Sequence, residues 1–266
     1  MEDKKLVLQA SDVSIMFGGL CAVNGFSCEL YQGELVGLIG PNGAGKTTMF
    51  NMISGIYTPT SGEINFWDSN NRVHKINNAS PAKLNKMGIA RTFQNIRLFG
   101  NLSVMDNVKI ALHNSRVANP LDVLFRTSTF HKDEQLMTDK VMQLLQLFKI
   151  DEKKDELAKN LPYGEQRELE IVRALASNPK LLLLDEPAAG MNPQETHELM
   201  KMIAFIRKEF DVTILLIEHD MKLVMGICEK ILVLDYGRVI ASGKPEDIRS
   251  NPQVIKAYLG GDVKID

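Results

Sequence analysis

A phosphate-binding loop is predicted by nine consecutive residues: Gly40, Pro41, Asn42, Gly43, Ala44, Gly45, Lys46, Thr47 and Thr48. They match the pattern G-x-x-x-x-G-K-[ST], in which glycines let backbone N–H groups turn inward around phosphate oxygens. The ammonium of Lys46 is expected to reach the β- and γ-phosphates, and the hydroxyl of Thr47 is a hard oxygen ligand for Mg²⁺. The sequence therefore predicts a site for a nucleoside triphosphate with magnesium.

Two adjacent carboxylates, Asp185 and Glu186, follow a run of four leucines. Such a run predicts a buried strand, and ligands bind at the carboxyl edge of a parallel sheet. Asp185 is expected to hold Mg²⁺ through water, and Glu186 to act as the base that polarises the attacking water. Two carboxylates at a strand end can also merely start a turn, but the phosphate-binding loop favours the catalytic interpretation.

Three other residues are expected at the same site. His219 follows an apolar strand predicted over residues 212–218 and can contact the γ-phosphate from the same edge. Gln94 ends a strand predicted over residues 89–93, and its amide can bind Mg²⁺ or the attacking water. Phe17 is an aromatic residue in an early turn that is suited to stacking on adenine, although such a residue is more often part of the core.

A second anion site is predicted at Gly164, where a turn precedes a charged helix expected over residues 165–176. This helix cannot serve the same nucleotide if the first loop already wraps the phosphates from one side. The simplest solution is a second copy of the fold, whose Tyr163, Gly164 and Glu165 cap a nucleotide bound by the first copy.

Strands that alternate with helices predict an α/β fold with a mainly parallel sheet. The expected core comprises residues 1–94 and 176–244, residues 95–175 form a helical sub-domain, and residues 245–266 form a helical tail. Within the core, we expect a turn over residues 58–63 and a surface loop over the Asn-rich residues 65–78. Within the sub-domain, residues 114–132 are expected to connect helices. The helical stripe that is expected to be buried comprises Leu136, Val141, Leu144, Leu145 and Phe148.

Composition excludes several classes of protein. The net charge of −2 makes nucleic acid an unexpected partner. The three cysteines have no CxxC spacing, which indicates a reducing compartment and three buried thiols. No apolar run approaches the roughly 20 residues that a membrane-spanning helix needs. Any action at a membrane therefore requires another polypeptide to span it.

These motifs together resemble the ATP-binding subunits of ABC transporters. GPNGAGKTT resembles their Walker A loop, and LLLLDEP resembles their Walker B motif. LPYGE resembles their signature motif, and AAGMNP resembles their D-loop. Gln94 corresponds to the glutamine of the Q-loop, and His219 corresponds to the switch histidine. FGGLCAVN, ARTFQNIRLF, LLIEHDMKLVMGIC and NPQVIKAYLG further resemble the G-type subunit of branched-chain amino-acid importers. The match covers essentially the whole chain, with the ABC domain expected over residues 6–244.

The resemblance implies a P-loop ATPase core with an antiparallel β portion and an inserted helical sub-domain, dimerised head to tail. It implies ATP and Mg²⁺ as cofactors, a pair of membrane permeases and an extracytoplasmic substrate-binding protein. The chain is then expected to be cytoplasmic and peripheral on the inner face of the cell membrane. Leu98 and Phe99 are interpreted as either a groove for a permease helix or part of the sub-domain core.

Two positions depart from the general family pattern. Pro162 replaces the signature serine and supplies neither a hydroxyl nor an N–H, and Asn192 replaces the usual D-loop aspartate. These changes suggest that the partner is a related but different subunit and that the two ATP sites are unequal. A urea importer, a lipopolysaccharide exporter and, less favoured, a non-transport ABC ATPase remain alternatives. A P-loop kinase would not explain LPYGE.

Overall fold

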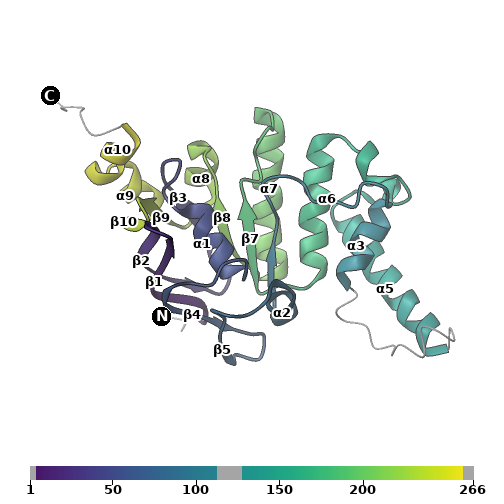
Figure 1. Ribbon diagram of the computed structural model, residues 1–266. Coiled ribbons are helices and arrows are strands. Elements are labelled where there is room, and N and C mark those ends of the chain that lie inside the picture. Colours follow the sequence, from purple (N-terminus) through teal and green to yellow (C-terminus); the bar gives the residue numbers. More distant parts are fainter. Residues whose placement is uncertain (1–3, 113–127, 260–266) are drawn as a thin grey trace. The chain divides into compact units, whose positions relative to one another are not determined.

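The computed structural model describes residues 4–112 and 128–259 (Figure 1). The chain divides into two compact units, one formed by residues 1–94 and 180–266 and the other by residues 95–179. Each unit is described separately below. No helix in the described residues is long and apolar enough to cross a membrane.

The first unit contains a six-stranded sheet with the order β10-β9-β3-β8-β7-β6. Its strands are β3 (Leu35–Ile39), β6 (Ile89–Arg91), β7 (Leu181–Asp185), β8 (Thr213–Ile217), β9 (Lys230–Asp235) and β10 (Arg238–Gly243). All neighbours are parallel except β9 and β10, which form an antiparallel hairpin. The three strands β3, β7 and β8 are buried along their whole length, as expected for parallel strands covered on both faces. The predicted α/β fold class is confirmed.

A second sheet of the first unit is antiparallel, with the order β2-β1-β4-β5. It comprises β1 (Leu6–Phe17), β2 (Leu20–Tyr31), β4 (Ser61–Trp67) and β5 (Val73–Lys75). The predicted turn over residues 58–63 and loop over residues 65–78 are therefore partly wrong. Asn77 itself lies in a turn, and its side chain accepts from the Ile64 N–H and donates to the Gly62 carbonyl of β4. It thus supplies hydrogen bonds at the end of a strand.

The core of the first unit is one apolar cluster that draws on both sheets and on helix α1 (Lys46–Ile53). Met49, Phe50, Met52 and Ile53 of α1 are fully buried in it. The other helices are α2 (Pro81–Met87), α7 (Pro193–Phe210), α8 (Met221–Ile227), α9 (Pro245–Arg249) and α10 (Pro252–Leu259). The predicted helical tail is thus two helices in its described part, because Asn251 accepts from the Gln253 N–H and Pro252 begins a new helix.

The second unit is helical and contains α3 (Val104–Leu112), α5 (Ser128–Leu147) and α6 (Tyr163–Ala176), with single 3-10 turns at Asp151–Lys153 and Ala158–Asn160. Residues 114–127 of the predicted connection lie outside the described residues, and residues 128–132 are already helical. Leu136 is 60% exposed and was wrongly placed in the buried stripe. The buried face of α5 instead follows Met137, Val141 and Leu145, which are spaced four residues apart.

Candidate nucleotide-binding site

The loop over residues 40–45 connects β3 to α1, and its three glycines all have a positive φ, while two of them also have no room for a Cβ. Gly40 has a φ of 152°, and a Cβ on it would lie 2.0 Å from the Leu234 carbonyl oxygen. Gly45 has a φ of 102°, and its Cβ would lie 2.6 Å from the Ala22 carbonyl oxygen. The path of the loop therefore depends on the absence of side chains at both positions.

Lys46 begins α1 and is only 6% exposed. Its Nζ donates to the carbonyl oxygens of Gly40 at 2.7 Å and Pro41 at 2.9 Å, so the ammonium lies inside the curve of the loop. Burial lowers the pKa of Lys46, and the charges of Glu186 and Asp185 oppose that shift. A buried cation at the N-terminus of a helix creates an environment that favours an anion such as a phosphate group.

A pocket of about 570 Å³ opens beside this loop. It is lined by residues 42–48 of the loop together with Phe17, Glu186 and His219, so the structure brings these predicted site residues together. Phe17 is half-exposed and packs edge to face on Tyr57, with 5.2 Å between the ring centroids. The Tyr57 contact restricts the orientation of the Phe17 ring beside the pocket.

Of the three cysteines, Cys28 and Cys228 are buried, and burial raises the pKa of each thiol to about 12. Cys21 is partly exposed and lines the pocket, so its predicted burial is wrong. The reason is its place on β2 next to the hairpin turn at residues 18–19, where the strand leaves the apolar cluster.

The carboxylate of Glu186 is held between the side chains of Gln94 and His219, which follow two other strands of the sheet. Gln94 donates its Nε2 to Oε2 of Glu186, and Nε2 of His219 lies at hydrogen-bond distance from Oε1, each at 2.7 Å. The φ of Glu186 is 48°, in the left-handed region that costs free energy for a residue with a side chain. Strain of this kind persists where surrounding contacts enforce it, here including the hydrogen bond from the Glu186 N–H to the Ile217 carbonyl.

Asp185 is buried and forms an ion pair with Arg91, whose Nη2 lies 2.7 Å from Oδ2 of the carboxylate. The other terminal guanidinium nitrogen, Nη1, donates to Asn51 and Ser54, so Arg91 connects the ends of β6 and β7 with α1. Asp185 does not line the pocket itself. The importance of Arg91 was missed from the sequence, where the only signal was a cation three residues before Gln94.

Glu218 is a second residue that the sequence reasoning missed. Its buried carboxylate accepts from the backbone N–H groups of Ala188 at 2.7 Å and His219 at 3.1 Å. It thereby connects the loop after Glu186 to the loop that carries His219. Burial raises the pKa of Glu218, while these backbone hydrogen bonds oppose the shift. A carboxylate directly after the uncharged run of residues 212–217 was the available signal.

Tyr163, Gly164 and Glu165 form the first turn of α6 in the second unit. Both carboxylate oxygens of Glu165 accept from Lys153 Nζ at 2.7 and 2.6 Å. The hydroxyl of Tyr163 accepts from the buried Arg167 at 3.4 Å. The backbone N–H groups at this helix start are the groups that can bind an anion, and Lys153 offsets the negative charge of Glu165 beside them.

Asn192, the unusual residue of the predicted D-loop, is the N-cap of α7 in the first unit. Its Oδ1 accepts from the N–H groups of Gln194 and Glu195, while the Glu195 carboxylate accepts from the Asn192 N–H. This reciprocal arrangement is a capping box, and it accounts locally for an asparagine at this position.

Comparisons with known proteins converge on one kind of protein. A family model described as ABC transporter matches residues 23–189, and a model described as branched-chain amino acid ATP-binding cassette transporter matches residues 238–264. The chain is 44% identical over 254 residues to the high-affinity branched-chain amino acid transport ATP-binding protein LivG of Escherichia coli K12, covering 96% of this chain and 98% of LivG. The protein BraF of Pseudomonas aeruginosa, which carries the same description, matches with the same identity and coverage.

Solved structures give the same picture. The ADP conformation of MJ1267, an ATP-binding cassette of an ABC transporter, matches with a TM-score of 0.81 and 30% identity, covering 96% of this chain and 99% of that one. The Clostridium perfringens protein cbiO1, described as part of the transporter complex cbiONQ, matches with a TM-score of 0.78 and 28% identity, covering 95% and 94%.

Proposed function

This chain belongs to the ABC transporter family of ATP-binding proteins, and on that premise we propose that it hydrolyses ATP to drive the import of branched-chain amino acids. The observation that carries the proposal is the Glu186 carboxylate, held by Gln94 and His219 at the edge of the pocket that the phosphate-binding loop lines. This arrangement combines a site for a triphosphate with an oriented base beside it.

The roles of the residues follow from their places. Backbone N–H groups within residues 42–48 and the Lys46 ammonium bind the phosphates, and Phe17 stacks on the adenine. Glu186 orients a water molecule for attack on the γ-phosphate and accepts its proton. Gln94 and His219 keep that carboxylate in place, and His219 also contacts the γ-phosphate.

Magnesium is part of the proposal, and the residues fit it. The Thr47 hydroxyl, the Gln94 amide oxygen and the Asp185 carboxylate are hard oxygen donors of the kind that Mg²⁺ prefers. Because one carboxylate oxygen of Asp185 is paired with Arg91, we expect Asp185 to contact Mg²⁺ through a water molecule. When bound, Mg²⁺ neutralises charge that develops on the phosphate oxygens.

The second half of each ATP site comes, we propose, from another subunit that binds head to tail. Its equivalent of the helix start at Tyr163–Glu165 caps the γ-phosphate with the backbone N–H groups that a helix N-terminus leaves unpaired. Pro162 removes one N–H and a hydroxyl from the cap that this chain donates. A related sister subunit with a complete signature would therefore give two unequal sites.

The unequal sites can be tested by Pro162→Ser in the mixed dimer. The substitution restores a hydroxyl and an N–H, so ATP turnover should rise. The exposed variant Ser250→Ala is the control and should leave turnover unchanged. A turnover that does not move in Pro162→Ser would show that the proposed inequality is wrong.

The remaining partners are transmembrane permeases, which place this chain on the inner face of the cell membrane, and an extracytoplasmic substrate-binding protein. Phe99 supports a contact with a permease, because its ring is half-exposed while its backbone is held by the buried Asn107. An apolar side chain on a rigid backbone suits a groove for a helix of another protein.

Reconstitution tests the proposed function. The chain, its sister subunit and the permeases are placed in vesicles with the binding protein outside and ATP with Mg²⁺ inside, and uptake of labelled L-leucine, L-isoleucine and L-valine is measured. Uptake should require ATP and should be lost with Glu186→Gln. ATP hydrolysis without uptake of any of the three amino acids would contradict the proposed substrate.

A further inference from the structure

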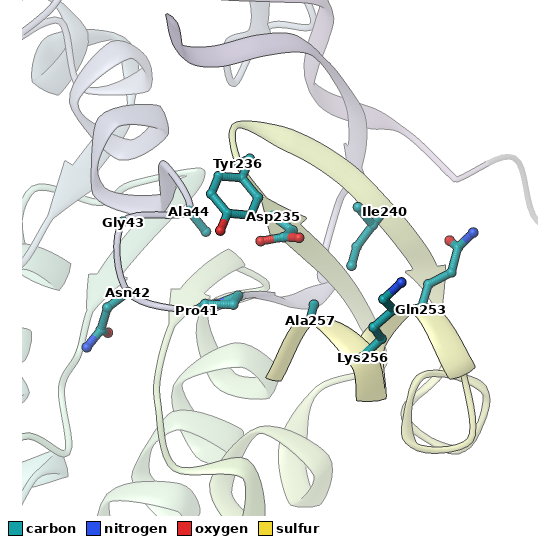
Figure 2. A pocket seen from close by; sticks show the side chains of 10 residues that line it. All are labelled: Pro41, Asn42, Gly43, Ala44, Asp235, Tyr236, Ile240, Gln253, Lys256 and Ala257. Atoms are coloured by element: carbon teal, nitrogen blue, oxygen red, sulfur yellow. The ribbon is translucent and has the colours of Figure 1, made fainter. Parts of the chain in front are cut away.

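A second cavity, of about 640 Å³, lies beside the phosphate-binding loop and is lined by residues of the β9–β10 hairpin and α10 (Figure 2). Its volume lies within the range of small-molecule sites. Its lining includes residues of the phosphate-binding loop and of the NPQVIKAYLG segment, but the proposed function assigns no ligand to the space between them. Its residues all belong to the first unit.

The cavity has one acid, one base and an apolar wall. Asp235 and Tyr236 lie on one side in Figure 2, and Lys256 lies on the other. Pro41, Ile240 and Ala257 supply apolar surface. Within residues 4–112 and 128–259, neither Asp235 nor Lys256 has an ion-pair partner, so both charges are available to a ligand.

A ligand that satisfies this lining needs a cationic group for Asp235, an anionic group for Lys256 and an aliphatic side chain for the apolar wall. An α-amino acid zwitterion with an aliphatic side chain has all three. A dication or a dianion would leave one of the two protein charges opposed to a like charge.

The cavity and the nucleotide pocket share part of their lining. Asn42, Gly43, Ala44 and Tyr236 border both, so a molecule in one contacts the same loop as a nucleotide in the other. The hairpin is also bonded to the loop, because the Gly237 N–H donates to the Ala44 carbonyl at 2.9 Å. A ligand bound between α10 and the hairpin therefore contacts the phosphate-binding loop and can change its conformation.

We propose that this cavity binds an aliphatic amino acid and that its occupancy lowers ATP turnover. The regulatory half of the proposal rests on the proposed function, in which the same class of molecule is the imported product. A product that binds next to the phosphate-binding loop would slow the transporter as the cytoplasmic concentration of that product rises.

The binding half is tested by calorimetric titration of the full-length chain with L-leucine, with and without saturating ADP. Asp235→Asn and Lys256→Met should each weaken binding about tenfold or more, because each removes a charge-assisted contact. The matched control variants Glu246→Gln and Lys244→Met each remove an exposed charge outside the cavity, one negative and one positive. Neither should change the affinity for leucine. Leucinamide, which lacks the carboxylate, should bind equally to the native chain and to Lys256→Met.

Saturable leucine binding that the two cavity variants weaken and ADP does not abolish would support the site. Absence of binding, or binding that is insensitive to both variants, would overturn it. The regulatory half is tested by the ATP turnover of the assembled transporter with saturating leucine on the nucleotide side. Leucine should lower the turnover of the native complex at least twofold. It should leave the turnover of the Lys256→Met complex unchanged. Equal turnover with and without leucine would overturn regulation, whereas absence of turnover without leucine would contradict the proposed function instead.

Discussion

The end of β7 in the first unit and the start of α6 in the second both gather carboxylates, but they hold them differently. Glu186 is held by the amide of Gln94 and the imidazole of His219 beside an open pocket. Glu165 and Glu170 are instead paired with the cations Lys153 and Arg167. A carboxylate paired with a fixed cation is partly committed to that partner, as Asp185 also is to Arg91, whereas Glu186 is oriented by side chains that carry no fixed charge.

The largest expected effect comes from Glu186→Gln, which removes the base but preserves the shape of the site. Turnover should fall by about 10²–10⁴-fold, while ATP still binds and traps the closed dimer. Steady-state phosphate release and size-exclusion chromatography with ATP measure the two effects.

The same substitution in the other region, Glu165→Gln, is the control, and it should retain turnover within a few-fold. If Glu165→Gln reduced turnover as much as Glu186→Gln, the distinction between a reactive and a structural carboxylate would be lost.

Arg167→Met addresses the buried pair of the second unit. Both side chains of the Arg167–Glu170 pair are almost fully buried, and Nη1 lies 2.8 Å from Oε2. Removing the cation leaves a buried carboxylate without its partner, which should reduce the free energy of unfolding by about 3–5 kcal/mol. Urea unfolding followed by circular dichroism measures this change.

The double variant Arg167→Met with Glu170→Leu should recover most of that stability, because no unpaired charge remains. A single variant as stable as the native chain would show that the pair contributes nothing.

Glu218→Gln concerns a third kind of carboxylate, buried and bonded only to backbone N–H groups. Glutamine has one acceptor oxygen for the N–H groups of Ala188 and His219, so one loop loses its support and turnover should fall about tenfold. The exposed Glu246→Gln should leave turnover unchanged. A Glu218→Gln variant with native turnover would remove Glu218 from a positioning role.

Stability should also depend on pH at Glu218. Because burial raises its pKa in the folded chain, its contribution to stability is complete below the ordinary value of 4.5 and is lost as pH rises through the raised pKa. Glutamine does not titrate, so the stability of Glu218→Gln relative to the native chain should increase across that interval. A constant difference between pH 4 and pH 8 in urea unfolding would contradict this.

The smallest effect is expected from Lys153→Met. The Lys153–Glu165 pair is partly exposed, with 38% and 30% of the two side chains accessible, so solvent screens the attraction. The loss of unfolding free energy should stay below about 1 kcal/mol. A loss comparable to that of Arg167→Met, measured by the same unfolding experiment, would show that burial does not separate the two pairs.

The elements that could be predicted are those with a clear local pattern. The apolar runs of β3, β7 and β8 and the helical stripe of α7 are visible in the sequence and appear in the structure. The strand β2 was not predicted and the region of β4 was interpreted as turn and loop, because glycine and asparagine interrupt the apolar pattern of both segments. Such strands gain their stability from pairing with β1, which no local pattern records.

The sequence by itself determined the phosphate-binding loop, because nine adjacent residues contain its glycines, its lysine and its hydroxyls. It also indicated that Gln94, Glu186 and His219 follow strands of one sheet, whose ends meet at one edge. The tertiary structure alone decided that Arg91 pairs with Asp185 and that Glu218 connects two loops. Contacts of this kind join residues that are distant along the chain, and burial in the folded core determines which charges find partners.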